Sequence, residues 1–219
     1  MKFLTDNQYI KNSFNTVRNM KGRKRYGKFQ IDFLDRHGLD AATHVLDFGC
    51  ADLRLGELIL PKLETGRYYG VDINAEALER GRQHCEAEGI STERATLFAT
   101  DRFALDPIPD GTLDIAFSNS VFSHLTLNSI LLCLRAVLPK LKPGGTYYSS
   151  MIILDEEWPV EQPKSWNQQD SIISYPARDP YHYPFSLVQQ TCAWAGASCE
   201  LRQDYGHPFQ KMVAFTRAA

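Results

Sequence analysis

Short apolar runs alternate with amphipathic stretches along most of the chain. Each run is rich in β-branched and aromatic residues and ends at a turn, which is typical of a buried strand. Between the runs, apolar residues recur at helical spacing, most regularly over 127–138. Strands that alternate with helices in this way indicate parallel βαβ units with right-handed crossovers. The predicted strands are residues 44–48, 67–72, 95–100, 113–119 and 146–153.

The last part of the chain predicts one more helix and two more strands. Ser186 and Gln189 form the pattern of a capping box, which predicts that a helix begins at Ser186. The two further apolar runs, 197–203 and 210–216, are joined by a short connection, which favours an antiparallel pair. Together with the five earlier strands, they predict an α/β fold with a doubly wound, seven-stranded, mostly parallel sheet whose last strand is antiparallel.

Residues 154–185 follow neither pattern. They hold five of the 11 prolines and two of the three tryptophans, without sustained periodicity. A loop of this length inside a compact domain is usually functional. We therefore expect a helical N-terminal extension over 1–40 and a domain over 41–219, with residues 154–185 as a loop that caps the substrate.

Composition limits the compartment and the partners. The 219 residues are 43% hydrophobic and 23% charged, which is a globular composition. The five cysteines are odd in number and form no CxxC pair, so we expect reduced thiols in a cytoplasmic protein and no metal site. Asp6 and Asn7 interrupt any signal-peptide core, and no apolar run approaches the ~18 residues of a membrane span. We therefore expect no membrane partner.

The net charge of −2 hides a basic N-terminal region. Residues 1–40 hold nine Lys/Arg and four Asp/Glu, and most of the excess lies in the basic run 21–28. We interpret this run as a solvated face; the alternatives are a lid near an anionic ligand and an RNA contact. Because the rest of the chain is acidic, nucleic acid is not the expected partner.

Acidic residues lie at the ends of three predicted strands. Asp47 is followed by a turn of small residues that begins with Gly49. Asp72 ends the second strand, about where a ribose-binding carboxylate is expected after such a turn, and Asp101 follows the third strand. Ligands of open α/β sheets bind beyond the carboxyl ends of the strands. The three acids are therefore predicted to face one crevice.

The chain resembles the class I S-adenosylmethionine-dependent methyltransferases of the small-molecule type. In that family the first loop reads D/E-x-G-x-G-x-G; here it begins with Asp47, Gly49, Cys50 and Ala51, and only the first glycine is kept. Alanine at a position that needs positive φ costs only ~1 kcal/mol, so this change does not exclude cofactor binding. The resemblance implies S-adenosylmethionine as cofactor. The motifs that carry it are V45-L-D-F-G-C-A-D-L-R-L-G56, Y69-G-V-D-I-N74, A99-T-D-R-F103, L113-D-I-A-F-S-N-S-V-F-S-H-L125 and L141-K-P-G-G-T146.

The resemblance also implies roles for residues beyond the first loop. Asp72 would bind the ribose hydroxyls and Ile73 would pack on the adenine. Asp101 would accept a hydrogen bond from the adenine amino group, with Arg102 beside it. Ser118, at the end of the fourth strand, would lie under the methionine part of the cofactor.

Simpler interpretations stand beside these roles. Asp47 could hold the loop through backbone hydrogen bonds without touching ligand, and Asp72 could cap the helix that follows Asn74. The rival enzyme class is a dinucleotide dehydrogenase, which requires G-x-G-x-x-G. Arg54 stands where the third glycine of that motif would be, so the fit to a pyrophosphate is poor.

His124 and the loop 154–185 are the candidates for acceptor chemistry. His124 lies just past the fourth strand, where the acceptor of the resembling family comes near the cofactor; it is either the general base or a residue that pins the loop. Trp158, Tyr181 and His182 are candidate substrate contacts, because aromatic rings with polar groups suit a sugar, a nucleotide or a flat natural product. The alternative is that the loop only packs over the edge of the sheet.

The predicted function is methyl transfer from S-adenosylmethionine to a small-molecule acceptor. We expect a hydroxyl group of a sugar, a polysaccharide precursor or a secondary metabolite. Two alternatives stay open: an RNA methyltransferase that uses the basic run, and a non-catalytic cofactor-binding protein of the same fold. The oligomeric state is left open.

Overall fold

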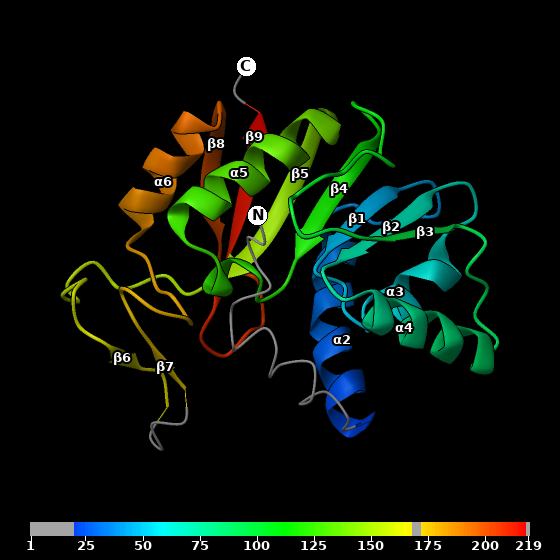
Figure 1. Ribbon diagram of the computed structural model, residues 1–219, viewed down its shortest axis with the longest axis horizontal. Coiled ribbons are helices and arrows are strands. Elements are labelled where there is room, and N and C mark those ends of the chain that lie inside the picture. The colour runs from blue at the N-terminus through cyan, green and yellow to red at the C-terminus, as the bar shows by residue number, and fades with distance from the viewer. Residues whose placement is uncertain (1–19, 168–171, 218–219) are drawn as a thin grey trace.

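The computed structural model describes residues 20–167 and 172–217, and a seven-stranded sheet forms its centre (Figure 1). The strands are β1 (His44–Phe48), β2 (Arg67–Asp72), β3 (Ala95–Ala99), β4 (Leu113–Ser118), β5 (Leu141–Met151), β8 (Ala197–Arg202) and β9 (Lys211–Arg217). Their order in the sheet is β3-β2-β1-β4-β5-β9-β8. Within this order, β3, β2, β1, β4 and β5 pair in parallel. β9 is antiparallel to both of its neighbours, β5 and β8. The predicted fold class is confirmed.

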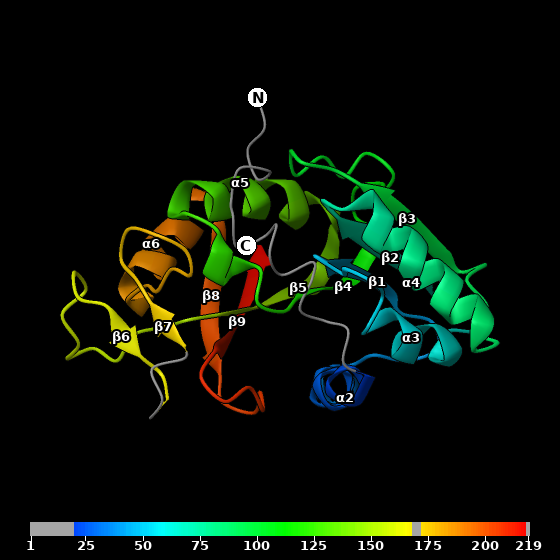
Figure 2. The ribbon, with the colours of Figure 1, turned by 60° about the horizontal axis from the view of Figure 1, so that its bottom comes forward.

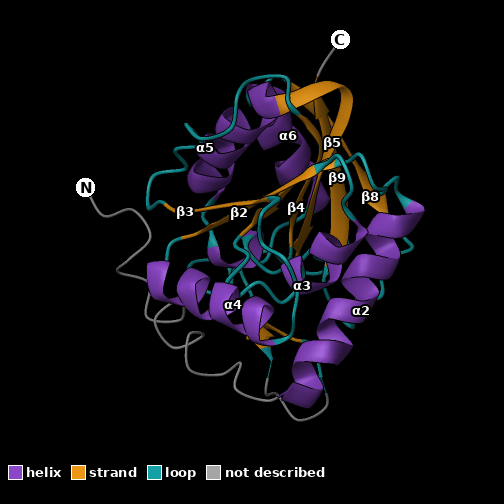
Figure 3. Ribbon diagram, turned by 90° about the vertical axis from the view of Figure 1, so that its right-hand side faces the viewer, coloured by secondary structure: helices purple, strands orange, loops and turns teal. Residues whose placement is uncertain are grey.

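Helices cover both faces of the sheet. They are α2 (Met20–Arg36), α3 (Gly56–Ile59), α4 (Ala75–Ala87), α5 (Leu127–Val137) and α6 (Phe185–Trp194), with short 3-10 turns η1 (Leu60–Lys62), η2 (Phe122–His124) and η3 (Leu138–Lys140). Figures 2 and 3 show α5 and α6 on one face and α2, α3 and α4 on the other. The buried apolar side chains form two clusters, one between the sheet and α5 and α6, the other between the sheet and α2, α3 and α4. Because helices cover both faces, a ligand is expected beyond the carboxyl ends of the parallel strands.

Several predicted boundaries differ from the structure, and two of them have a clear physical reason. α6 begins at Phe185 after Pro184, and no side chain caps it, so the capping box at Ser186 does not form. The fixed φ of proline is suited to a helix start and places it before Ser186. β5 begins earlier than predicted because Leu141 pairs with Leu113 before the register shifts. Neither feature changes the topology.

The second half of α2 belongs to the core of the domain. Phe33 is fully buried, and its ring meets that of Tyr205 edge-on, with ring centroids 5.2 Å apart. His37 Nε2 lies 2.9 Å from Asp204 Oδ2, which ties the end of α2 to the β8–β9 connection, residues 203–210. Residues 1–19 of the predicted extension lie outside the described residues. No helix within the described residues has the length and apolar character to cross a bilayer.

Residues 154–185, here called the cap, leave the main sheet after β5 and return at α6. They contain a small antiparallel sheet of β6 (Lys164–Ser165) and β7 (Ile173–Ser174), which stands apart from the main sheet in Figure 1. The returning chain is held by backbone hydrogen bonds. Tyr181 N donates to Ser123 O over 2.7 Å, and Tyr183 N donates to Ile152 O over 3.0 Å. The cap is thereby docked on η2 and on the end of β5.

Candidate active site

The carboxyl ends of the parallel strands meet along one edge of the sheet. Pairing aligns Phe48 with Val71 and Asp72 with Ala99, so the loops after β1, β2 and β3 are neighbours. β1 lies between β2 and β4, and this reversal of strand order is the switch point at which open α/β sheets bind ligands. The structure thus brings together the loops that carry Gly49, Asp72 and Asp101.

The loop after β1 keeps its shape without most of the usual glycines. Gly49 has a φ of +80°, and a Cβ on it would lie 2.5 Å from Val121 Cγ2. Ala51 and Leu53 replace glycines, yet they also adopt positive φ, +49° and +61°. Such backbone is strained for residues other than glycine and persists where the surroundings hold it. Ala51 and Leu53 therefore hold backbone conformations that glycine would adopt at lower cost.

Asp72 connects this loop to the end of β2. Its Oδ2 accepts from Ala51 N and its Oδ1 accepts from Asn74 N, both over 2.9 Å. Burial raises the pKa of the carboxyl, and the backbone donors oppose that shift. Asn74, not Asp72, caps α4 by accepting from Glu76 N. A carboxylate has about four acceptor sites, so Asp72 retains capacity for hydroxyl donors.

Asp47 lies beneath the loop and does not project from it. Tyr68 Oη donates to Asp47 Oδ2 over 2.8 Å. The observed partner of Asp47 is therefore a side chain, whereas the simpler interpretation of the sequence was a bond to the loop backbone. Burial raises the pKa of Asp47 to about 7, although the Tyr68 hydrogen bond opposes the rise. Burial also raises the pKa of the Cys50 thiol well above its usual range. Cys50 contributes its backbone N–H, which donates to Val71 O over 3.1 Å.

The segment after β3 combines an exposed ion pair with a buried ring. Asp101 Oδ1 lies 3.6 Å from Arg102 Nε, and both side chains are accessible. Phe103 has a φ of +55°, and its ring stacks on Phe48 with centroids 6.0 Å apart. Ile73, at the start of the loop after β2, is half-buried. The sequence analysis did not select Phe103, because an aromatic residue after a strand carries no local signal of its role.

The side chain of Ser118 is directed toward residues of β5. Its hydroxyl is fully buried, donates to Ser149 Oγ over 2.7 Å and lies 3.0 Å from Tyr147 Oη. If Ser118 lies under the methionine part of the cofactor, as predicted, its backbone and not its hydroxyl group would make the contact. The chain turns at Ser120, which has a φ of +59°.

A polar network joins the ends of β4 and β5 to the β8–β9 connection. Ser120 N donates to Ser150 Oγ over 2.7 Å, and both serine hydroxyls donate to Gln210 Oε1. Tyr205 Oη donates to Asn119 Oδ1 over 2.5 Å. Gln210 and Tyr205 were missed in the sequence, because they reach the site only through the tertiary fold. The network fixes the β8–β9 connection against the ends of β4 and β5.

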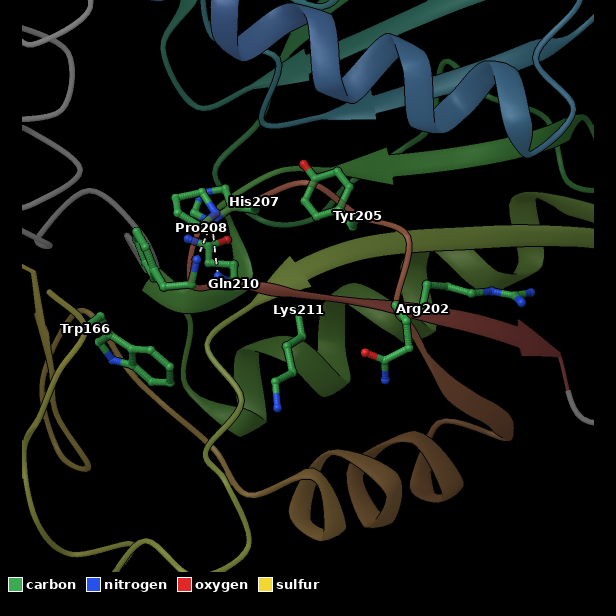
Figure 4. A pocket seen from close by; sticks show the side chains of 9 residues that line it. Trp166, Arg202, Tyr205, His207, Pro208, Gln210 and Lys211 are labelled. Atoms are coloured by element: carbon green, nitrogen blue, oxygen red, sulfur yellow. Dashed lines mark hydrogen bonds between the residues drawn. The ribbon is translucent and has the colours of Figure 1, made fainter.

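A pocket of about 270 Å³ opens beside this network, between the β8–β9 connection and the cap (Figure 4). Trp166 lines it from the cap, Lys211 from the start of β9, and Gln210 joins it to the network. His207 also lines it, but its Nδ1 accepts from Gln210 N over 3.0 Å. Burial lowers the pKa of His207 to about 4. His207 is therefore a neutral part of the turn and not a candidate base.

His124 meets a carboxylate from the cap. Its Nδ1 lies 2.5 Å from Asp179 Oδ1, with side chains 16% and 11% exposed. His124 ends η2, which begins at Phe122 just after Val121, the residue against Gly49. The predicted base is thus placed on the turn that borders the loop after β1.

The other predicted substrate contacts lie in the cap with different surroundings. His182 is buried; Ser174 Oγ lies 2.8 Å from its Nδ1 and Val160 O lies 3.3 Å from its Nε2. Both ring nitrogens have partners inside the cap, and burial lowers the pKa of His182, so its surroundings do not support the predicted substrate contact. Trp158 is 37% exposed, with the Lys164 ammonium 4.9 Å from its ring centroid. Tyr181 stacks on Tyr183, with centroids 6.2 Å apart.

No three His, Cys, Asp or Glu side chains come together as a metal site would require, as far as residues 20–167 and 172–217 are concerned. The described site offers carboxylates, hydroxyl groups and the His124–Asp179 pair for chemistry.

Known proteins resemble both the sequence and the fold. The family model described as "Methyltransferase domain" matches residues 46–147. The ribosomal protein L11 methyltransferase of Ralstonia pickettii is 29% identical over 124 residues, which cover 56% of this chain and 36% of that protein. The chain thus spans little more than a third of the length of that curated relative.

Solved structures share the architecture at low identity. An S-adenosylmethionine-dependent methyltransferase from Clostridium acetobutylicum aligns with a TM-score of 0.67 and 13% identity, over 97% of this chain and 100% of that one. The magnesium protoporphyrin IX methyltransferase of Synechocystis, solved with bound S-adenosylmethionine, aligns with a TM-score of 0.61 and 14% identity, over 93% and 86%. At such identities the likeness shows the fold.

Proposed function

Because residues 46–147 are a methyltransferase domain in a chain with the class I, S-adenosylmethionine-dependent methyltransferase fold, we propose that the protein methylates a hydroxyl group of a small molecule. The observation that carries the proposal is the loop after β1. Ala51 and Leu53 keep a left-handed backbone, and Asp72 binds Ala51 N. The chain thus maintains a strained ligand loop where the family has glycines.

The residues at the strand ends fit the cofactor. The Gly49 turn has no side chain, and Asp72 can accept hydrogen bonds from a ribose diol. Ile73 would pack on the adenine, and Asp101, with Arg102 beside it, would accept from the adenine amino group. When bound, the sulfonium group supplies a methyl group that is already activated.

The protein then has to align the acceptor and exclude water. The network of Ser120, Ser150 and Gln210 ties the ends of β4 and β5 to the β8–β9 connection and would form one wall of the acceptor site. Asp47 and Tyr68 support the loop after β1 from below. In this proposal these groups shape the site and need not exchange protons.

The cap supports a small acceptor. It is docked on η2 and borders a pocket of about 270 Å³. This volume lies just below the ~300–1,000 Å³ of typical ligand pockets, which favours a small acceptor over a large one. Trp166 and Tyr205 offer flat surfaces, and Lys211 offers a cation. His124 would accept the hydroxyl proton, and Trp158 and Tyr181 remain proposed contacts at the rim.

The alternative acceptor is a protein, and the match to ribosomal protein L11 methyltransferases favours it. That match covers only about a third of those proteins, so it does not extend to their whole length. The RNA alternative rests on the basic run. Of that run, Lys28 pairs with Asp32 over 3.0 Å, and the side chains of residues 21–26 lie outside the described residues.

The test is transfer of label from methyl-labelled S-adenosylmethionine to three acceptor sets: hydroxylated small molecules, ribosomal protein L11 and RNA. We expect label in the small-molecule set. At subsaturating cofactor, the Asp72→Ala variant should transfer less label than the wild-type protein. Asp106→Asn, which changes an exposed acid, is the matched control. Label confined to L11 or to RNA would overturn the acceptor proposal. Cofactor binding without label in any set would favour a non-catalytic protein.

A further inference from the structure

We infer that Asp179, contributed by the cap, is the positioning residue of His124: it holds the imidazole in the tautomer that carries its proton on Nδ1. This rests on the proposed function, in which Nε2 of His124 receives the proton of the acceptor hydroxyl. Asp179 lies 55 positions after His124, so the cap completes the site chemically as well as covering it.

The geometry sets the direction of the hydrogen bond. A carboxylate only accepts, so the contact of 2.5 Å requires that His124 Nδ1–H donates to Asp179 Oδ1. In neutral imidazole the lone pair then resides on Nε2. His182 shows the opposite arrangement, because its Nε2–H must donate to the Val160 carbonyl. The fold therefore imposes different tautomers on two histidines of the same region.

The carboxylate has little else to bind. Asp179 Oδ2 is buried and has no hydrogen-bond partner among the described residues. The neighbouring Arg178 guanidinium lies 3.7 Å from the ring centroid of Tyr175 and forms a cation–π contact there. An ion pair with Arg178 would have weakened the hold of Asp179 on the imidazole. In a site with little water, a charge-assisted bond of this kind is strengthened.

The backbone holds the pair from both sides. Tyr181 N donates to Ser123 O, one residue before His124, over 2.7 Å. Tyr183 Oη donates to Leu125 O, one residue after His124, over 2.7 Å. Burial raises the pKa of Tyr183, with Tyr181 and Asp179 adding to the rise, so the Tyr183 hydroxyl stays neutral beside the pair. The position of Asp179 is thus built into the docking of the cap.

The pair completes a balanced step. The acceptor oxygen forms its bond to the methyl carbon with a lone pair, and the electrons of the broken sulfur–carbon bond return to sulfur. The hydroxyl proton passes to Nε2 of His124, which becomes an imidazolium. Asp179 stabilises that cation through Nδ1–H without touching the acceptor, as the orienting acid does in other acid–histidine pairs.

The test replaces Asp179 with asparagine, glutamate and alanine. The asparagine amide can donate to Nδ1, so Asp179→Asn should move the proton to Nε2. We expect the ¹⁵N NMR signals of His124 to switch from the Nδ1–H to the Nε2–H pattern. Turnover should fall by ~10²-fold or more with little change in KM for the cofactor. Asp179→Glu should restore the wild-type tautomer and part of the turnover, and Glu157→Gln, an exposed acid of the cap, should change neither.

The two readouts separate the possible failures. If the wild-type protein transfers no methyl group, the proposed function fails, while the NMR result still decides the role of Asp179. A folded Asp179→Asn protein that keeps the Nδ1–H pattern, or that keeps full turnover, would overturn the inference. If Asp179→Asn does not fold, the comparison of Asp179→Glu with Asp179→Ala decides, because only a restored carboxylate is expected to restore the Nδ1–H pattern.

Discussion

Asp47→Asn should stabilise the protein most strongly above neutral pH. The wild-type carboxyl is buried under the loop after β1, and its pKa rises from 3.8 to about 7 on folding, chiefly through burial. The folded state therefore binds a proton that the unfolded state has released. Asp47 contributes its full stability below pH 3.8, and that contribution is lost as pH rises through 7. Asparagine has the same shape and no charge, and its Oδ1 can still accept from Tyr68 Oη.

The size of the effect follows from the shift. Each pKa unit corresponds to about 1.36 kcal/mol, and about two units separate pH 5 from the folded pKa of about 7. Between pH 5 and pH 8 the wild type should lose about 2.7 kcal/mol of unfolding free energy that the variant keeps. His207 and Asp72 also titrate differently on folding, but they are present in both proteins and largely cancel in the comparison.

Urea unfolding of both proteins at a series of pH values from about 5 to about 8 measures this gap. The unfolding free energy of Asp47→Asn minus that of the wild type should widen steadily as pH rises. Asp106→Asn, which removes an exposed acid, should follow the wild type. A gap that stays constant within about 0.5 kcal/mol would refute the reasoning, because it would mean that Asp47 keeps an ordinary titration in the folded protein.

Two further substitutions test the geometry of the loop. Ala51→Gly should raise stability by up to about 1 kcal/mol in thermal or urea unfolding, because Ala51 has a φ of +49°; a clear loss would show that the alanine methyl is needed for packing. Gly81→Ala should cost about 1–3 kcal/mol and weaken binding of S-adenosylmethionine in calorimetry, because its Cβ would lie 2.6 Å from the backbone of Asp52; unchanged stability and affinity would show that α4 can move away from the loop.

The sequence predicted the sheet because its information is local. The bounds of β1 and β2 agree with the prediction, since apolar runs that end at Gly49 and at Asp72 leave little freedom for the strand ends. The start of α6 was wrong because Pro184 competed with the capping pattern at Ser186. In these cases, the outcome depended on residues within one turn of each other.

The site was harder to predict where direction and distance matter. Ser118 lies on a strand that is buried on both faces, and such a strand has no alternation of polar and apolar residues to show which way its side chains point. Asp179 and Gln210 reach their partners across 55 and 90 positions. That Asp72 and Asp101 come close together could be predicted, because parallel strands bring their carboxyl ends together, whereas Asp47 lies within β1 and is bound by Tyr68. The cap contacts could not, because an irregular segment has no period from which to infer its path.

Calorimetric titration with S-adenosylmethionine is the sharpest check of cofactor binding. We expect saturable binding to the wild-type protein. Asp72→Ala should weaken it by ~1.5–3 kcal/mol, or roughly 10- to 150-fold, because the loss removes the charged acceptor that we propose for the ribose and releases Ala51 N. Tight binding of NADH together with no response to S-adenosylmethionine would contradict the account.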